Sequence, residues 1–117
     1  MNAPGGPAVG LIVEDQEREF RDYVLSRVQG LFGSRIHSVS LFGSRARRSA
    51  RIDSDWDVAV VLKSTMDIGS DFKKLIMVSR SIKQETKLDV HFVAITAEQL
   101  AAEGALEANI RRESIPF

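Results

Sequence analysis

The stretch from Leu41 to Leu62 contains a glycine–serine pair and, ten residues further on, two aspartates that flank a tryptophan. Gly43 would let backbone N–H groups come close to phosphate oxygens, and Ser44 adds a hydroxyl donor. Residues i and i+2 of a strand share a face, so Asp55 and Asp57 should project side by side. Neighbouring carboxylates repel each other unless a cation lies between them, and Mg²⁺ often binds one or two carboxylates together with substrate phosphates. These four residues predict a phosphate cradle joined to a magnesium site.

A third carboxylate is expected on another strand. The run Lys87–Ile95 alternates between two faces and contains one acidic residue, Asp89. With Asp55 and Asp57 it could hold two metal ions, about 3.5–4 Å apart in such sites, around an in-line displacement at phosphorus. Asp89 would also be placed to orient or deprotonate an attacking hydroxyl. We expect His91, on the same face, to have a structural role or to contact the metal ligands.

The connector between the glycine–serine pair and the aspartates is basic. Its first residues could form a short helix whose N-terminus points at the same anion. Arg45 and Arg47 are the arginines that we predict to bind nucleotide phosphates, while Arg48 and Arg51 complete the cluster. The alternative is that all four lie in a solvated loop.

Hydrophobic periodicity predicts the elements that must hold these residues. Three helices and three strands are expected, in the order helix (Glu14–Gln29, ending at Gly30), strand (Ile36–Phe42), strand (Trp56–Leu62), helix (Asp71–Glu85, capped by Ser70), strand (Lys87–Ile95) and helix (from Thr96 to about Glu113, interrupted near Gly104). This order predicts a mixed α/β (α+β) fold, with a small mixed sheet, helices mainly on one face and the other face partly open. The apolar residues expected to face inward from the second helix are Phe72, Leu75, Ile76, Val78 and Ile82.

The pentapeptide Leu-Phe-Gly-Ser-Arg occurs twice, at Leu31–Arg35 and at Leu41–Arg45. Only the second copy follows a strand-like run and precedes the aspartates at the required distance. The first copy is interpreted as a turn that ends a helix. Residues 1–12, rich in proline and glycine, are predicted to be a flexible tail, and residues 13–117 a single domain.

Composition limits the possible classes of function. Sixteen basic residues balance sixteen acidic ones, so no overall field favours nucleic acid, and we expect no direct binding to it. The absence of cysteine excludes disulfides and thiolate metal sites. No apolar run approaches the length of a membrane span, and the first residues do not resemble a signal peptide, so a cytoplasmic location is expected.

The pattern Gly43-Ser44, ten residues, Asp55-x-Asp57 and a later strand aspartate, Asp89, resembles the nucleotidyltransferase superfamily related to DNA polymerase β. The short chain is similar to its minimal nucleotidyltransferases, the antitoxin half of HEPN–MNT toxin–antitoxin pairs. Many relatives have glycine where this chain has Arg48. The resemblance implies a polymerase β-like palm fold and assigns the phosphate, metal-pair and third-carboxylate roles to these positions.

By the same resemblance, the chain would transfer a nucleoside monophosphate from a nucleoside triphosphate, expected to be ATP, to a hydroxyl, with Mg²⁺ and release of pyrophosphate. The acceptor would be a tyrosine or another hydroxyl of a separately encoded helical HEPN partner. The open sheet face could also receive a second copy of the chain.

Two other functions remain open. A non-catalytic binding module would neutralise the same partner by covering it. A small-molecule nucleotidyltransferase, similar to aminoglycoside-modifying enzymes, is less favoured, because those enzymes usually have an additional helical domain and we expect none in this chain.

Overall fold

The computed structural model describes residues 6–47, 54–102 and 104–117, with side chains from residue 17 onwards. The elements follow one another as α1 (Gly6–Phe32), a 3-10 turn η1 (Gly33–Arg35), β1 (Ile36–Phe42), α2 (Gly43–Ala46), β2 (Trp56–Leu62), α3 (Ile68–Thr86), β3 (Val90–Thr96), α4 (Ala97–Leu100), α5 (Ala105–Glu113) and β4 (Ile115–Pro116).

The four strands form one mixed sheet with the order β3-β2-β1-β4. β1 is antiparallel to β2 and to β4, whereas β2 and β3 are parallel and are joined by the crossover helix α3. Phe42 pairs with Asp57, which in turn lies opposite His91 on β3. The predicted mixed sheet is therefore confirmed, and its register brings the end of β1, the start of β2 and the start of β3 together.

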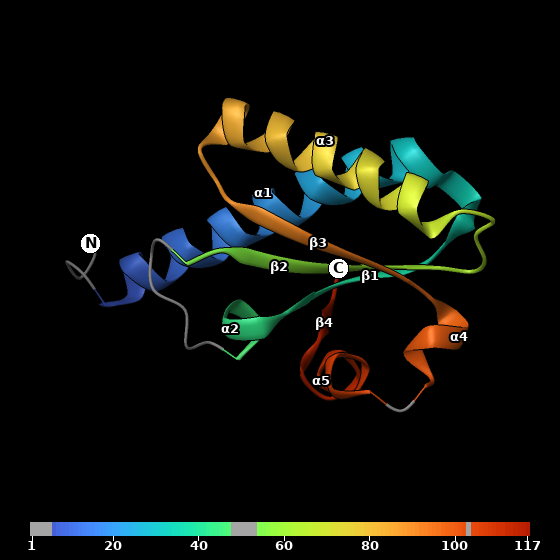
Figure 1. Cartoon of the computed structure of the whole chain (residues 1–117). Helices are drawn as coiled ribbons and strands as arrows, with labels where there is room; N and C mark the ends of the chain where they lie inside the picture. Colours follow the sequence, from blue (N-terminus) through green and yellow to red (C-terminus); the bar gives the residue numbers. More distant parts are fainter. Residues whose placement is uncertain (1–5, 48–53, 103) are drawn as a thin grey trace.

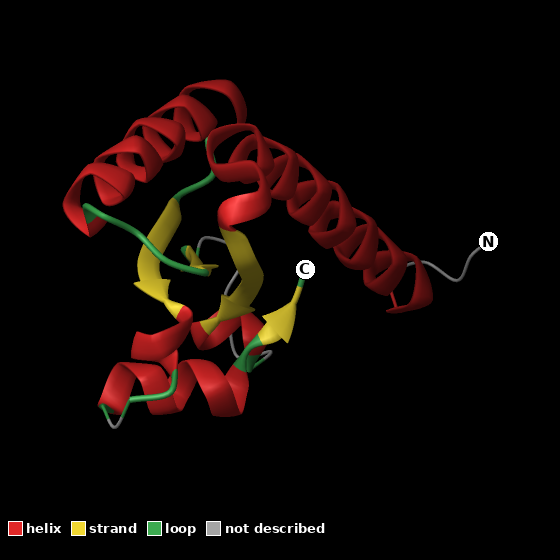
Figure 2. Cartoon of the chain, turned by 90° about the vertical axis from the view of Figure 1, so that its right-hand side faces the viewer, coloured by secondary structure: helices red, strands yellow, loops and turns green. Residues whose placement is uncertain are grey.

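Helices α1 and α3 lie on one face of the sheet (Figures 1 and 2). The alternation along β2 explains this, because Trp56, Val58, Val60 and Leu62 all point into the core that these helices cover. The large buried side chains of α1 and α3 on this side are Phe20, Val24, Val28, Phe32, Leu75, Val78 and Ile82. This layer is the main core of the protein.

A smaller apolar cluster lies on the opposite face of the sheet. Ala59 and Val61 of β2 pack there with Ile95 of β3 and Ile110 of α5. Figure 2 shows α4 and α5 on this side, below the strands. Helices thus cover mainly one face, as expected, and the second face is covered in part. A capping box at Thr96 and Gln99 starts α4, as predicted, and Gly104 separates it from α5.

Helix α1 is longer than the sequence pattern indicated. It begins at Gly6 rather than Glu14, so residues 6–12 of the predicted tail are helical, and it continues past Gly30 to Phe32. The chain then turns at Gly33, whose φ of +53° favours glycine, which confirms that the first pentapeptide copy is a helix-ending turn. None of the helices in the described ranges is long and apolar enough to cross a membrane.

Two details of α3 differ from expectation. The cap is Asp67, whose side chain accepts a hydrogen bond from the Ser70 backbone N–H, so Ser70 is not the cap. Phe72 and Ile76 do not face inward but are 41% and 36% exposed. They line a groove between α3 and β3 instead of lying in the core.

The end of the chain completes the sheet, which the sequence did not predict. Ile115 and Pro116 pair with β1, and the backbone N–H of Phe117 donates to the carbonyl of Val39 at 2.9 Å. The ring of Phe117 meets Phe20 edge to face, with centroids 6.4 Å apart. The C-terminal residues therefore stabilise the edge of the sheet beside α1.

A buried carboxylate links the turn before β1 to the first turn of α3. Arg35 contacts both oxygens of Asp71, at 2.7 and 3.4 Å, and Thr65 donates to the same carboxylate. Asp71 is only 4% exposed. The hydrogen bond from Arg35 is the main reason why the pKa of Asp71 lies below its usual value.

Asp71→Asn should lower the free energy of unfolding at pH 7 by about 1–3 kcal/mol, because a buried charge-assisted hydrogen bond is lost. The folded-state pKa is depressed, so the stabilisation is present above the unfolded-state pKa and is lost as the pH falls through the folded-state value. The difference between variant and parent should shrink below about pH 4 in denaturant titrations. Glu98→Gln, on an exposed residue, is the control and should change little. Equal stability of parent and Asp71→Asn at pH 7 would contradict the assignment.

Candidate functional site

The backbone of Gly43 lies directly against the carboxylate of Asp57. Gly43 is the first residue of α2 and has φ +74°, a conformation that favours glycine. A Cβ atom at this position would come within 3.1 Å of the Asp57 carboxyl carbon and closer still to Oδ2. Ser44 follows in the same turn and is half-buried. The predicted glycine–serine cradle therefore lies beside one of the two predicted metal ligands.

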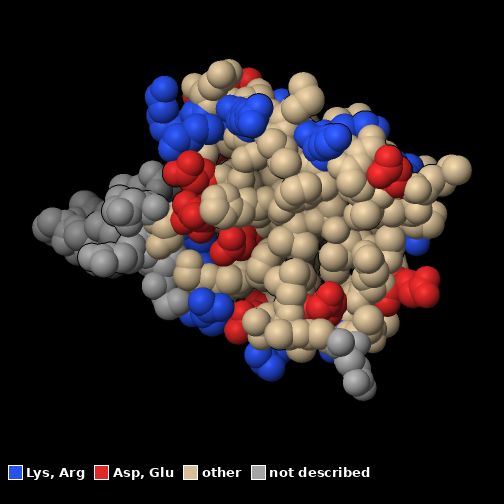
Figure 3. Space-filling model, in the orientation of Figure 1, with Lys and Arg blue, Asp and Glu red and all other residues tan. Residues whose placement is uncertain are grey.

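Asp55, Asp57 and His91 lie close together where β2 and β3 begin. Nε2 of His91 is 3.4 Å from Oδ2 of Asp55, and His91 is the register partner of Asp57. Figure 3 shows acidic side chains gathered at the end of the sheet where β2 begins, with basic side chains close by. The sequence pattern placed His91 on the correct face, and the structure brings it to the paired aspartates.

The pKa of Asp57 is raised above its ordinary value. Burial is the main cause, and the charge of Asp55 raises the pKa further, while His91 and Arg47 oppose the shift. The charged form of Asp57 is thus disfavoured by its surroundings. A cation beside Asp55 and Asp57 would relieve this penalty.

Asp89 does not join the other two carboxylates. It lies just before β3, and its Oδ2 forms an ion pair with Nζ of Lys83 at 3.0 Å. No group of three His, Cys, Asp or Glu side chains in the described ranges is arranged to hold a metal ion. The three carboxylates are not brought together in this structure, in which Asp89 is paired with Lys83 of α3. The role of Asp89 stays a prediction.

Arg45 stacks on Trp56 instead of pointing freely at the cradle. Its guanidinium carbon is 4.1 Å from the centre of the indole ring, and its Nη2 donates to the Ser54 carbonyl at 2.8 Å. On the other side of Trp56 the ring of Phe20 stacks at 4.0 Å. Trp56 is thus anchored in the core, and Arg45 orients the segment that leads into β2.

Arg47 is also held by the protein. Its Nη1 is 2.9 Å from Oε2 of Glu113 at the end of α5. This pairing was not predicted, because no local pattern relates residues so far apart in the sequence. Arg48 and Arg51 lie outside the described residues.

The described side chains fit a divalent cation held by two carboxylates. Asp55 directly precedes β2, and its charge acts on Asp57 in the strand. Neither carboxylate accepts a hydrogen bond from lysine or arginine in the described part of the chain. Mg²⁺ needs no more than one or two carboxylates when phosphates and water complete its shell. Asp55 and Asp57 are the residues that could hold it.

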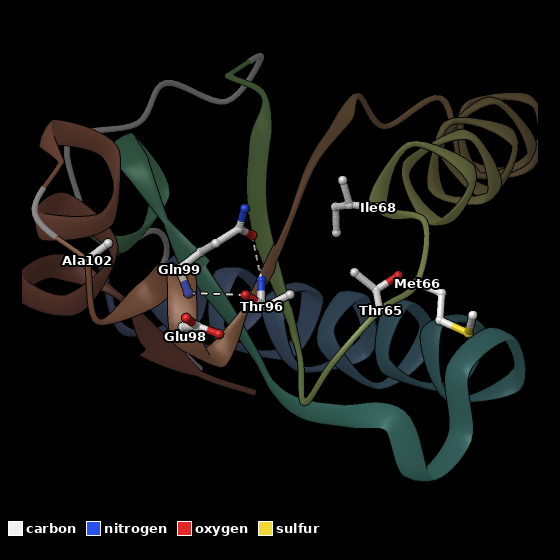
Figure 4. A pocket seen from close by; sticks show the side chains of 7 residues that line it. All are labelled: Thr65, Met66, Ile68, Thr96, Glu98, Gln99 and Ala102. Atoms are coloured by element: carbon white, nitrogen blue, oxygen red, sulfur yellow. Dashed lines mark hydrogen bonds between the residues drawn. The ribbon is translucent and has the colours of Figure 1, made fainter.

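A cavity of about 510 Å³ lies where β2 and β3 end, at the other end of these strands from the paired aspartates (Figure 4). Its polar groups are largely occupied by internal hydrogen bonds. Thr96 and Gln99 bond each other in the capping box, and the hydroxyl of Thr65 donates to Asp71. These groups hold helix ends in place, so this cavity does not compete with the carboxylate site.

Comparisons with known proteins give the family and the fold of the chain. The model of the family described as "Polymerase beta, Nucleotidyltransferase" matches residues 28–114, which span every residue of the candidate site. No curated protein sequence matches the chain.

Several solved structures have a similar fold. One is a protein from Sulfolobus solfataricus assigned as a nucleotidyltransferase, with a TM-score of 0.61 and 22% identity over 99% of this chain and 91% of that one. A toxin–antitoxin complex with AMP-PNP gives a TM-score of 0.55 and 18% identity over 79% and 68% of the two chains. The toxin–antitoxin MntA–HpeT, in a mutant form, gives 0.54 and 16% over 80% and 69%.

Gly43→Ala should destabilise the protein by about 1–3 kcal/mol, because it combines a left-handed backbone with a clash against Asp57. Gly30→Ala is the matched control, since a Cβ there meets nothing within 4 Å and Gly30 lies inside α1. That change should stabilise the protein by about 0.5–1 kcal/mol. Thermal or denaturant unfolding measures both. A Gly43→Ala variant as stable as the parent would show that the close approach is not required.

Asp57→Asn should raise the melting temperature at pH 7 when no metal is added, because it removes a charge that the folded state disfavours. The folded-state pKa is raised, so the penalty is absent below the unfolded-state pKa and complete above the folded-state value. Parent and variant should therefore melt alike near pH 3 and diverge as the pH rises. A variant that melts lower than the parent at pH 7 would contradict this account of the site.

Proposed function

Because the chain belongs to the polymerase β type of nucleotidyltransferases, we propose that it transfers a nucleoside monophosphate from a nucleoside triphosphate to a hydroxyl group. The observation that supports this most directly is the contact between the Gly43 backbone and the Asp57 carboxylate, with Asp55 beside it. A phosphate-binding turn and a pair of cation-binding carboxylates are the two parts that phosphoryl transfer needs side by side.

The residues of the chain would act by positioning and by balancing charge. Gly43 and Ser44 would bind the phosphates, and Arg47 would add positive charge after exchanging Glu113 for a phosphate oxygen. Asp55 and Asp57 would hold Mg²⁺, which neutralises the negative charge of the triphosphate when bound. Asp89 would orient the acceptor hydroxyl or take its proton once Lys83 releases it. Arg45 would keep the start of β2 in position through Trp56.

We further propose ATP as the donor and a separately encoded toxin as the acceptor, which makes the chain an antitoxin that acts in the cytoplasm. The similar structures support this, since two of them are toxin–antitoxin complexes and one contains AMP-PNP. A helical HEPN partner that offers a tyrosine or another hydroxyl is the acceptor implied by the resemblance to minimal nucleotidyltransferases.

A second function, neutralisation of the partner by binding alone, is favoured by two ion pairs. Asp89 is bound to Lys83 and Arg47 to Glu113, so two of the predicted site residues would have to change partners before catalysis. This alternative predicts a stable complex whose partner remains unmodified.

Asp55→Asn and Asp57→Asn should each reduce transfer by about 10²-fold or more, because the cation loses a ligand at the triphosphate. The measurement uses ATP labelled at its α-phosphate and the protein encoded beside this one, with and without Mg²⁺. Circular dichroism should show that both variants fold, and Glu98→Gln should keep full transfer. Undiminished labelling by both aspartate variants would overturn the mechanism, and a stable unlabelled complex would favour the binding module.

A further inference from the structure

A groove of about 430 Å³ lies between the outer side of α3 and β3, which is an edge strand of the sheet. Its walls include Phe72, Ile76 and Arg80 from α3 and His91 from β3. The three α3 residues follow one another at intervals of four, so they form one stripe along the helix. Two large apolar side chains of this stripe remain 41% and 36% exposed.

The surface beside the groove is positively charged. The acids of α3 have partners on other elements, because Asp71 pairs with Arg35 and Glu85 accepts from Tyr23 on α1. Arg80 lines the groove, Lys73 follows Phe72 in the same turn, and both are exposed; within the described ranges neither of them forms an ion pair. Figure 3 shows Lys and Arg side chains along the upper part of the molecule, over α3.

The groove also reaches the candidate site. His91 lines it and lies 3.4 Å from Asp55. A molecule that occupied the groove would therefore end beside the paired carboxylates. Continuity with the site distinguishes this surface from Leu106 on α5, whose 42% exposure is similar but which does not line the groove.

We propose that this groove binds an amphipathic helix of the protein that receives the nucleotide, with an apolar stripe against Phe72 and Ile76 and acidic residues facing Lys73 and Arg80. The inference rests on the proposed function, since it identifies how the acceptor protein is held next to the transfer site. A helix fits because ridges spaced by four residues pack against similar ridges of another helix. The basic rim selects acidic flanks by charge complementarity.

A strand added to β3 fits less well. Its pairing would need free backbone groups on β3, and the Val90 carbonyl already accepts a hydrogen bond from Ser79 Oγ at 2.6 Å. Ser79 of α3 thus already occupies this backbone acceptor of the strand. The favoured occupant is a helix that contacts α3.

The test uses two synthetic helical peptides with the same leucine stripe, one flanked by glutamates and the other by lysines. Fluorescence anisotropy should show that the full chain binds the acidic peptide at least about tenfold more tightly than the basic one, and more weakly as salt is added. Ile76→Glu and Phe72→Glu should each raise the dissociation constant of the acidic peptide by about tenfold or more, because they place a negative charge at an apolar anchor. Leu106→Glu is the control with matched exposure and should bind as the parent does.

ATP binding, followed separately by equilibrium dialysis in Mg²⁺, distinguishes this proposal from the proposed function. Ile76→Glu should keep ATP binding, whereas Asp57→Asn should weaken ATP binding and keep peptide binding. Failure of the parent to bind ATP would count against the transfer site alone. Equal binding of both peptides, no binding of either, or an unchanged affinity in Ile76→Glu would overturn the docking proposal. Sedimentation gives one more result that would overturn it. If the parent self-associates and Ile76→Glu does not, a second copy of the chain occupies the groove.

Discussion

The close approach of Gly43 to the carboxylate of Asp57 is the contact on which the rest of the site depends. It requires a residue without Cβ, a positive φ and an antiparallel register in which Phe42 lies opposite Asp57. A shift of that register by one residue would turn Asp57 into the main core and bring Trp56 or Val58 to the cradle. The buried alternation of β2 therefore determines the position of the site as well as the stability of the sheet.

The surrounding structure holds this register from several sides. Stacking of Arg45, Trp56 and Phe20 connects the entry to β2 with α1, and Phe117 extends the contact to the end of the chain. Arg47 reaches Glu113 on α5, which lies on the other face of the sheet. Residues 43–47 therefore contact both the α1 side and the α5 side of the sheet. Residues that were expected to bind nucleotide also position the turn.

The charges of the site disfavour ionised Asp57 in the free protein and favour the binding of a cation. Burial and a neighbouring carboxylate disfavour the charge of Asp57, while nearby basic groups are already paired with acids of the protein. In the proposed function, a bound metal–triphosphate would exchange these internal partners for phosphate and metal. Lys73 and Arg80 on α3 form no ion pair within the described ranges, which is why we assign them to an external partner instead.

The sequence by itself determined the polymerase β-like resemblance, the mixed sheet and the positions of Gly43, Ser44, Asp55 and Asp57, because these depend on local spacing and on strand alternation. Only the tertiary structure showed that Lys83 binds Asp89 and that Glu113 binds Arg47, since ion pairs between different elements leave no periodic signal. It also showed that Phe72 and Ile76 are exposed. Periodicity identifies an apolar stripe, but packing decides which part of the stripe another element covers.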